Sequence, residues 1–465
     1  MVKKIKDKQD SPKIKELKHQ ARRHVIKEGI FTTIANSFGV NFISPFAIAI
    51  NSSNSMVAML SSITGFLGPL SQIPGSKLIE KYSRKKIILK SVFLESLIWL
   101  PLILIAFLFY KEILINILPI SLLLFFSIFT ILLNIGHPAW FSWVGDIVDE
   151  KYRGRWYAKR SLLIGFTSVV LAISGGFFLE WFKTMGWTAY GFMILFFLAF
   201  LARLACWKIF KRTYDPKLKL KKGYYFSFSE FLLNAHKNNF GRFAIFRFFL
   251  GFATTLSSAL IAIYLIRYLE FNYPTYMIIT LSGAFFSVLV LGLWGKFADK
   301  YGNYKVIKIT SILIPFVPFL WILHTSPIYL IFVAQLVGGI TWAGFNLASG
   351  NFIYDNVSQQ KRGLAISYYN LLVGMGVFLG AGLSAFLIKS LPTPPLESII
   401  IIFVLGGILR FIVIIFGLSK IKEIKSKKKI KSAIAIKNLL FKEGKSTLLE
   451  EVHEITSIKK YLNTK

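Results

Sequence analysis

A pattern that occurs twice in the chain, about two hundred residues apart, places the strongest constraint on its fold. An aspartate, a valine two residues later and an Arg-Gly pair run from Asp146 to Gly154 and again from Asp355 to Gly363. Segments 80–86 and 299–305 form a second pair, each with an acidic residue, a Lys-Tyr pair and a basic end. Two repeated patterns at corresponding places predict two structurally related halves.

The hydrophobic content of the chain places those halves in a membrane. Hydrophobic residues make up 54% of the 465 residues, and 45 of them are Phe. The apolar runs approach the roughly 20 residues that a helix needs to cross a bilayer. A single span in lipid must satisfy its own backbone hydrogen bonds, which favours helices. We therefore predict an all-α membrane protein with 12 transmembrane helices in two six-helix pseudo-symmetric halves.

The hydropathy pattern predicts the limits of the spans and of the segments around them. In the first half the spans are 29–50, 54–75, 86–110, 113–145, 156–182 and 186–210. In the second half they are 241–268, 274–296, 304–324, 327–353, 364–389 and 396–419. The predicted domains are a basic N-terminal tail (1–28), the first half (29–210), a linker (211–240), the second half (241–419) and a basic C-terminal tail (420–465).

Basic residues predict the orientation of the chain. Lysine and arginine crowd both tails, the linker and the loops after the second and fourth spans, while the alternate loops have few. The positive-inside rule then places both termini in the cytoplasm of a multi-pass protein of the cell membrane. The formal net charge of +34 is explained by contact with anionic lipid, so membrane lipid is an expected partner and nucleic acid is not.

Several classes of chemistry have no residues to support them. The single cysteine, Cys206, excludes an intramolecular disulfide and a cysteine-based metal cluster. Phosphate-binding Walker loops, HExxH and Gly-x-Ser-x-Gly motifs are also missing from the sequence. We therefore expect no cofactor, no metal and no enzymatic activity.

The second of the two acidic segments carries a family resemblance. Gly295, Asp299, Lys300, Gly302 and Lys305 resemble the loop signature of the major facilitator superfamily, between the second and third spans of a half. The first copy departs from the signature, because it has Ser76, Glu80 and Ser83 where the second has Gly295, Asp299 and Gly302. Its basic end, at 84–86, is intact. The resemblance extends over residues 29–419.

The resemblance implies a monomeric secondary transporter that works by alternating access, with charged contacts closing its cytoplasmic side. We expect Glu80 to pair with Arg153 and Asp299 with Arg362, although such charges also serve topology alone. The expected gate and motif residues are Glu80, Arg84, Asp146, Arg153, Gly295, Asp299, Gly302, Lys305, Asp355 and Arg362.

In the same superfamily the first and fourth spans of each half line a cavity at the membrane midplane, which implies a set of substrate-contacting residues. They are Asn36, Asn41, Asn134, His137, Trp140, Thr254, Thr255, Ser257, Trp342 and Asn346. Pro138 removes a backbone donor, so the fourth span is expected to kink near His137. His137 either contacts the solute or bridges two helices.

Ionisable residues inside spans are costly and need an explanation. Glu95 is the candidate for proton coupling, and the alternative is an ion pair within the first half. Arg203 and Arg410 lie in the inner third of the sixth and twelfth spans. We expect both to extend to the cytoplasmic interface rather than to bind substrate.

The predicted function is transmembrane transport of a small organic solute, secondary active or facilitative. Amides beside indoles suit a polar, sugar-like solute. Efflux of hydrophobic or cationic drugs is the alternative, and a transporter-like receptor without flux is an alternative of another class. Import or export, and a coupling proton or none, stay open at this point.

Overall fold

The computed structural model describes residues 11–148, 153–216, 227–357 and 362–423. All elements in these ranges are helical. The first half contains α1 (Pro12–Phe38), η1 (Val40–Phe42), α2 (Ile43–Ala49), α3 (Asn54–Lys81), α4 (Arg84–Tyr110), α5 (Leu118–Ile135), α6 (His137–Ile147), α7 (Arg153–Thr184) and α8 (Thr188–Arg212).

The second half begins with a short connecting helix, α9 (Phe228–Asn234), and the turn η3 (Ala235–Lys237). It continues with α10 (Asn239–Ser258), η4 (Ile263–Tyr268), α11 (Tyr273–Tyr301), α12 (Asn303–Leu313), η5 (Ile314–Phe316), α13 (Val317–Leu323), α14 (Pro327–Tyr329), η6 (Leu330–Gln335), α15 (Leu336–Asn356), α16 (Arg362–Ser390) and α17 (Pro395–Leu418).

The predicted fold class is confirmed, with one span built differently from the others. In the part of the chain that the structure describes, eleven helices are long and apolar enough to cross a membrane. The predicted first span, 29–50, is divided among the end of α1, η1 and α2. Helix α1 also starts inside the predicted N-terminal tail, because Ser11 caps it and Pro12 suits its first turn.

Several spans are interrupted near their middle. The fourth span breaks at Gly136 between α5 and α6, two residues before Pro138, as the proline predicts. In the second half, the span that contains α12 passes through η5 at Pro315, and α15 follows the π-helical segment η6. The interruptions at Pro138 and Pro315 fall where a proline removes a backbone donor.

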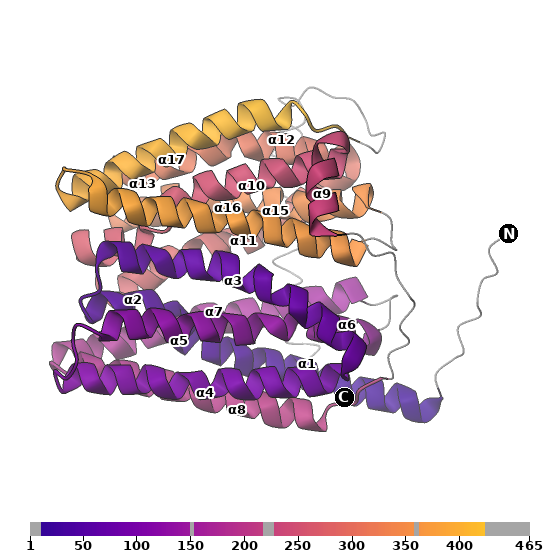
Figure 1. Ribbon diagram of the computed structural model, residues 1–465, viewed down its shortest axis with the longest axis horizontal. Helices are drawn as coiled ribbons and strands as arrows, with labels where there is room; N and C mark the ends of the chain where they lie inside the picture. Colours follow the sequence, from indigo (N-terminus) through magenta and orange to yellow (C-terminus); the bar gives the residue numbers. More distant parts are fainter. Residues whose placement is uncertain (1–10, 149–152, 217–226, 358–361, 424–465) are drawn as a thin grey trace.

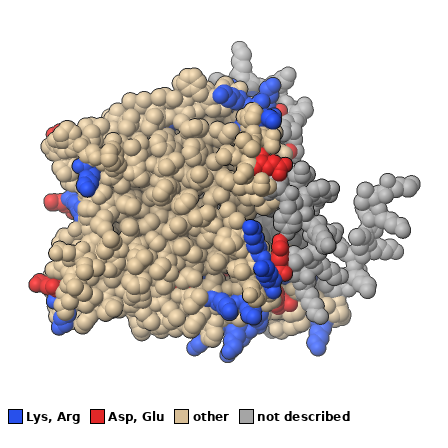
Figure 2. All heavy atoms as spheres, viewed as in Figure 1, with Lys and Arg blue, Asp and Glu red and all other residues tan. Residues whose placement is uncertain are grey.

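The helices run roughly parallel and have two common ends (Figure 1). We call the end where α1 begins and α8 and α17 finish the basic end, and the opposite end the far end. On the face seen in Figure 2, charged side chains gather at the two ends and leave a broad uncharged band between them. Exposed side chains such as Leu104, Phe177 and Ile415 suit contact with lipid in a band of this kind.

The two halves pack together along α3 with α16 and along α7 with α11. One buried apolar cluster includes residues of both halves, such as Phe46, Phe192, Tyr273 and Phe403. Two further clusters each stay within one half, around Trp143 in the first and around residues 243–250 in the second. The shared cluster positions the halves against each other and surrounds the site described next.

Candidate functional site

A cavity of about 540 Å³ lies between the halves, mostly inside the second. The first half contributes Ser44 from α2 and Ser61 from α3. Helices α10, α11, α13, α15 and α17, with the π-helical segment η6, form most of the remaining wall. Both halves therefore reach the same space, as a site between two moving halves requires.

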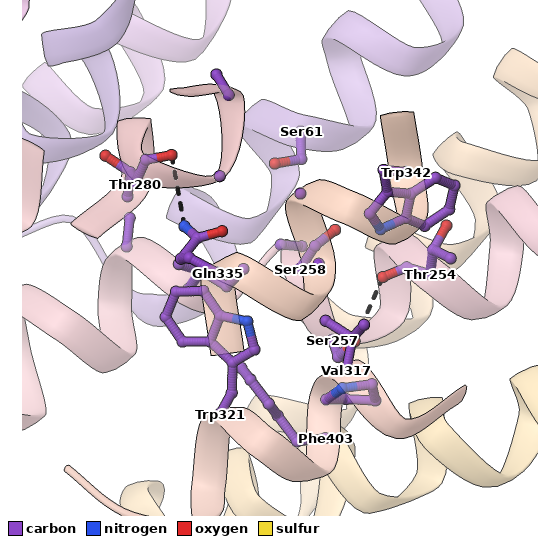
Figure 3. Close-up of a pocket in the computed structure, with 18 of the residues that line it drawn as sticks. Ser61, Thr254, Ser257, Ser258, Thr280, Val317, Trp321, Gln335, Trp342 and Phe403 are labelled. Atoms are coloured by element: carbon purple, nitrogen blue, oxygen red, sulfur yellow. Dashed lines mark hydrogen bonds between the residues drawn. The ribbon is translucent and has the colours of Figure 1, made fainter. Parts of the chain in front are cut away.

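The lining of the cavity is rich in hydroxyl groups and in aromatic rings (Figure 3). The hydroxyl side chains are Ser44, Ser61, Thr254, Ser257, Ser258, Tyr276, Thr280 and Ser287. The Gln335 amide belongs to the wall and donates to the Ile279 carbonyl at 2.7 Å. Trp321, Trp342 and Phe403 supply flat apolar surfaces. Such a mixture favours a small solute that has both polar groups and an apolar face.

Arg410 lies in the cavity wall, contrary to the expectation that it extends to the interface. Its side chain is buried, with 4% of the residue exposed. The guanidinium donates to Ser257 Oγ at 2.6 Å, to the Thr254 carbonyl at 3.1 Å and to the Ile314 carbonyl at 3.3 Å. Across the described ranges, no salt bridge joins Arg410 to a carboxylate. The expectation is wrong because these neutral acceptors hold the side chain inside the bundle.

Arg203 is also buried rather than extended to the interface, but its charge is neutralised. It forms an ion pair with Glu95 and donates to Thr32 Oγ1 at 2.8 Å. The Thr32 hydroxyl in turn donates to Glu28 at 2.7 Å, and Glu28 lies 3.5 Å from Arg160. Glu95 therefore lies in an ion-pair network within the first half and is not among the residues that line the cavity.

The predicted cavity residues of the second half lie at or beside the cavity. Thr254, Ser257 and Trp342 line it. Thr255 is buried behind the wall and donates to the Gly251 carbonyl at 2.9 Å. Asn346 is exposed and outside this lining. Three of these side chains therefore line one cavity, two from the last turns of α10 and one from α15.

The predicted cavity residues of the first half do not line this cavity. Asn134 accepts from Gln72 at 3.0 Å and donates to the Thr130 carbonyl, which joins α3 to α5. His137 packs edge-on against Phe141, and Trp140 lies under Arg160 at 5.0 Å. Asn36 is exposed and Asn41 is half-buried. Contact of these residues with a substrate stays a prediction.

At the basic end, the repeated aspartates bind the helix that starts the third span of their own half. Arg84 lies 2.6 Å from Asp146 and also donates to the Ser142 and Pro216 carbonyls. Asn303 donates to Asp355 at 2.8 Å. Arg84 and Asn303 are related by the same offset of 219 as Glu80 and Asp299, so the two contacts are pseudo-symmetric.

The linker adds a charge at this point that sequence reasoning missed. Asp215 lies 3.9 Å from Arg84. Burial raises the pKa of the Asp215 carboxyl, and the Arg84 guanidinium opposes that rise. The start of the linker therefore helps to hold α4 in place, because Arg84 also donates to the Pro216 carbonyl and Lys85 donates to the Thr213 carbonyl. The signal available in the sequence was Asp215 itself, an acidic residue shortly after the predicted sixth span.

The two expected gate pairs fall partly outside what the structure describes. Arg153 and Arg362 are the first residues of α7 and α16, and their side chains lie outside the described residues. Glu80 and Asp299 lie in the last turns of α3 and α11. Pairing of Glu80 with Arg153, and of Asp299 with Arg362, stays a prediction.

The two signature glycines differ in their local roles. Gly302 has φ +96° and separates α11 from α12, a conformation that favours glycine. Gly295 lies inside α11, and a Cβ built there would meet nothing within 4 Å. In the first copy Ser83 replaces the second glycine and caps α4 by accepting from the Lys86 amide. Lys305 lies over the Tyr301 ring at 5.7 Å.

At the far end, direct polar contacts join the two halves. Arg267 binds the Asn54 side chain and donates to the Ser52 carbonyl at 2.8 Å. Asn54 also donates to Tyr268 at 2.7 Å, and the Tyr273 amide donates to Glu180 at 3.1 Å. We call these bonds the far-end contact. They join α3 to η4 and α7 to the start of α11 at this end.

Comparison with known proteins agrees with the fold. A family model described as Major Facilitator Superfamily matches residues 29–285 and 243–453. Comparison with curated proteins finds no significant match. Among solved structures, a mutant of the nucleoside transporter NupG shares 14% identity, with a TM-score of 0.63, over 87% of this chain and 100% of that one.

Two further solved structures have similar folds. A bacterial homologue of the iron transporter ferroportin in an inward-facing state shares 14% identity, with a TM-score of 0.64, over 86% of this chain and 99% of that one. The E. coli fucose:proton symporter FucP shares 13% identity, with a TM-score of 0.54, over 86% of this chain and 98% of that one. At this identity the likeness concerns the fold.

Proposed function

The chain belongs to the major facilitator superfamily, and on that premise we propose that it carries a small polar organic solute across the cell membrane by alternating access. The observation that carries the proposal is the cavity of about 540 Å³, to which both halves contribute hydroxyl groups and the second half adds two indole rings. A volume in this range suits a small organic molecule.

The packing of the halves supports a rocking motion around that cavity. The far-end contact and the shared apolar cluster join the halves on one side of it. Toward the basic end each half has its own apolar cluster. Two internally packed halves are able to move as units when the bonds between them break and form again at the other end.

The charge pattern supports an orientation for this motion. We place the basic end in the cytoplasm by the positive-inside rule. The described conformation is then the one that is closed toward the outside. Alternation would require the far-end contact to separate while new contacts form at the basic end, where the proposed Glu80–Arg153 and Asp299–Arg362 pairs would act.

The cavity also supports polar cargo over the two alternatives. Eight hydroxyl side chains in the lining offer hydrogen bonds that a purely hydrophobic drug would leave unmet. A cationic drug would meet the Arg410 guanidinium in the same wall. A receptor would bind solute in this cavity without moving it, so only flux distinguishes it from a transporter.

The direct test is uptake by vesicles that contain the purified full chain. A panel of radiolabelled sugars, nucleosides, amino acids and organic acids would be compared with empty vesicles, with and without an imposed pH gradient. We expect saturable uptake of at least one polar solute, reduced at least tenfold in Trp342→Ala. Binding without uptake for every solute that binds would favour a receptor and contradict the proposal.

A further inference from the structure

The two halves place an arginine at matching positions, and among the residues that the structure describes only one of the two has a counter-charge. Arg203 on α8 and Arg410 on α17 each bind a hydroxyl on the first helix of their half, Thr32 on α1 and Ser257 on α10. Each also reaches the third span of its half. There Arg203 meets the Glu95 carboxylate, whereas Arg410 meets the carbonyl of Ile314.

The sequence repeat places Glu95 and Ile314 at equivalent positions of the two halves. Adding the offset of 219 that relates Glu80 to Asp299 converts position 95 into position 314 (95 + 219 = 314). The second half therefore has an isoleucine at the place where the first half has the acid. One pseudo-symmetric site is a neutral pair, and the other is a buried cation.

A buried guanidinium without a carboxylate is costly unless something else compensates it. The Arg410 bonds to one hydroxyl and two carbonyls satisfy donors but supply no negative charge. The Nε atoms of Arg410 and Arg203 are both buried without a hydrogen-bond partner, so the two arginines differ in the Glu95 counter-charge of Arg203. Arg410 also belongs to the lining of the cavity, so a molecule in that cavity is able to reach it.

We infer that the cavity takes an anionic solute, and that Arg410 is the counter-charge for its acidic group. The inference rests on the proposed function and names the charge class of the cargo. The Ser257 and Thr254 hydroxyl groups line the cavity beside Arg410. They complete a site for a carboxylate or another oxyanion, because charge-assisted hydrogen bonds to arginine are the strong ones.

The remaining lining suits the rest of such a solute. Gln335 and Thr280 belong to the same cavity, and Trp321 and Trp342 offer flat surfaces (Figure 3). A small organic acid with hydroxyl or ring groups would therefore find partners along its whole length. A cation of the same size would meet Arg410 without a compensating acid.

The test is thermal unfolding of the purified full chain with matched pairs of solutes that differ only in charge. Glucuronate is compared with glucuronamide, nicotinate with nicotinamide, and succinate with succinamide. Cys206 is buried and is the single cysteine, so a thiol-reactive fluorogenic maleimide reports unfolding without labelling the folded protein. A ligand that binds only the folded state raises the melting temperature.

We expect an acid, and not its amide, to raise the melting temperature in at least one pair. Arg410→Gln should weaken binding of that acid at least tenfold. The matched control is Arg247→Gln, since Arg247 is held by Tyr369 at 2.9 Å and by the Phe345 ring, and does not line the cavity. It should leave the preference for the acid unchanged.

A second variant supplies the missing charge from the protein and keeps the test valid if Arg410→Gln does not fold. Ser257→Asp places a carboxylate where the hydroxyl already meets Arg410, so it should abolish the response to the acid. Ser257→Asn has a similar size and no charge. It removes a hydroxyl of the site and should weaken binding of the acid, but it should keep the preference for the acid over the amide that Ser257→Asp abolishes.

Equal shifts from acid and amide, no shift from any acid, or an unchanged acid response in both Arg410→Gln and Ser257→Asp would each overturn the inference. These outcomes differ from a failure of the proposed function. If a neutral solute is transported by vesicles and Arg410 has no effect, the transporter stands and the anionic site does not. If an acid binds as expected but no solute crosses the membrane, transport fails and the binding site stands.

Discussion

The guanidinium of Arg84 lies 2.6 Å from the carboxylate of Asp146 and ties the start of α4 to the end of α6. The Asp146 side chain is 46% exposed, whereas that of Arg84 is 1% exposed. Arg84 also donates to two backbone carbonyls and to the Ser142 hydroxyl. The arginine is therefore the centre of the contact, and the aspartate is one of several partners.

Replacement of Arg84 should destabilise the protein more than replacement of Asp146. Arg84→Ala leaves several acceptors without a donor, so we expect a loss of about 2 to 4 kcal/mol. Asp146→Asn removes a half-exposed charge and should cost less than about 1 kcal/mol. Maleimide-detected unfolding at Cys206 measures both. Equal losses would contradict the central place of Arg84.

The Glu95–Arg203 pair should behave as a coupled unit. Glu95→Gln leaves a buried guanidinium without its counter-charge, with an expected loss of about 3 to 5 kcal/mol. The double variant Glu95→Gln with Arg203→Gln should be more stable than Glu95→Gln alone. A double-variant cycle of melting temperatures measures the coupling.

The same variant separates the structural role of Glu95 from proton coupling. Were Glu95 the carrier of a coupling proton, Glu95→Gln would fold with the melting temperature of the native chain. Its uptake would then lose the dependence on an imposed pH gradient. That pair of results would contradict the structural role that the geometry of the pair supports.

Loss of the far-end contact should expose the cavity from that side. Arg267→Ala removes the bonds to Asn54 and to the Ser52 carbonyl. In a Cys206→Ala background, Ser258→Cys places a thiol at an exposed position in the cavity lining. We expect a membrane-impermeant maleimide, added from the far side, to label this thiol several times faster after Arg267→Ala.

The control for that experiment is an arginine at the other end of the bundle. Arg242 donates to the His236 carbonyl near the start of α10. Arg242→Ala should leave labelling from the far side unchanged. An equal increase in both variants would mean that general loosening, rather than the far-end contact, governs access.

The two glycines of the signature should respond differently to alanine. Gly302→Ala forces an alanine to φ +96° and should cost about 1 kcal/mol or more. Gly295→Ala meets no neighbouring atom in the described conformation and should stabilise α11 by up to about 1 kcal/mol. Melting temperatures test both, and a large loss of stability in Gly295→Ala would be the contrary result.

The Gly295→Ala variant also tests the signature in the transport cycle. If Gly295→Ala folds well but loses uptake, the close approach that requires this glycine occurs in another conformation. Unchanged uptake would mean that the glycine has no steric role in either conformation.

Much of the fold was predictable from the sequence because lipid imposes strong local requirements. Apolar runs indicated the spans, and Pro138 indicated the break between α5 and α6. The first span was harder to delimit, since α1 begins in a polar segment where capping by Ser11, and not hydropathy, sets the start. The role of Glu28 was missed because this residue lies just before the predicted start of the first span, at residue 29.

The candidate site was less predictable because it depends on which faces of the helices meet. Thr254, Ser257 and Trp342 line the cavity, yet Asn134 is bonded between α3 and α5. Ser61 and Gln335 also line the cavity. Both lie in predicted spans, 54–75 and 327–353, but neither was among the predicted cavity residues. The spacing of polar residues along a span does not indicate whether a side chain faces the cavity or a neighbouring helix.

The sequence by itself determined that this chain is a two-half helical membrane protein, because hydropathy and repeated motifs are properties of the linear order. Only the tertiary structure decided that Arg203 is neutralised by Glu95, while Arg410 lies in a cavity wall where the described residues supply no carboxylate. Both arginines look alike in sequence, near the inner ends of matching spans. Their difference arises from a residue on another helix, Glu95 in one half and Ile314 in the other, and packing alone brings that residue within reach.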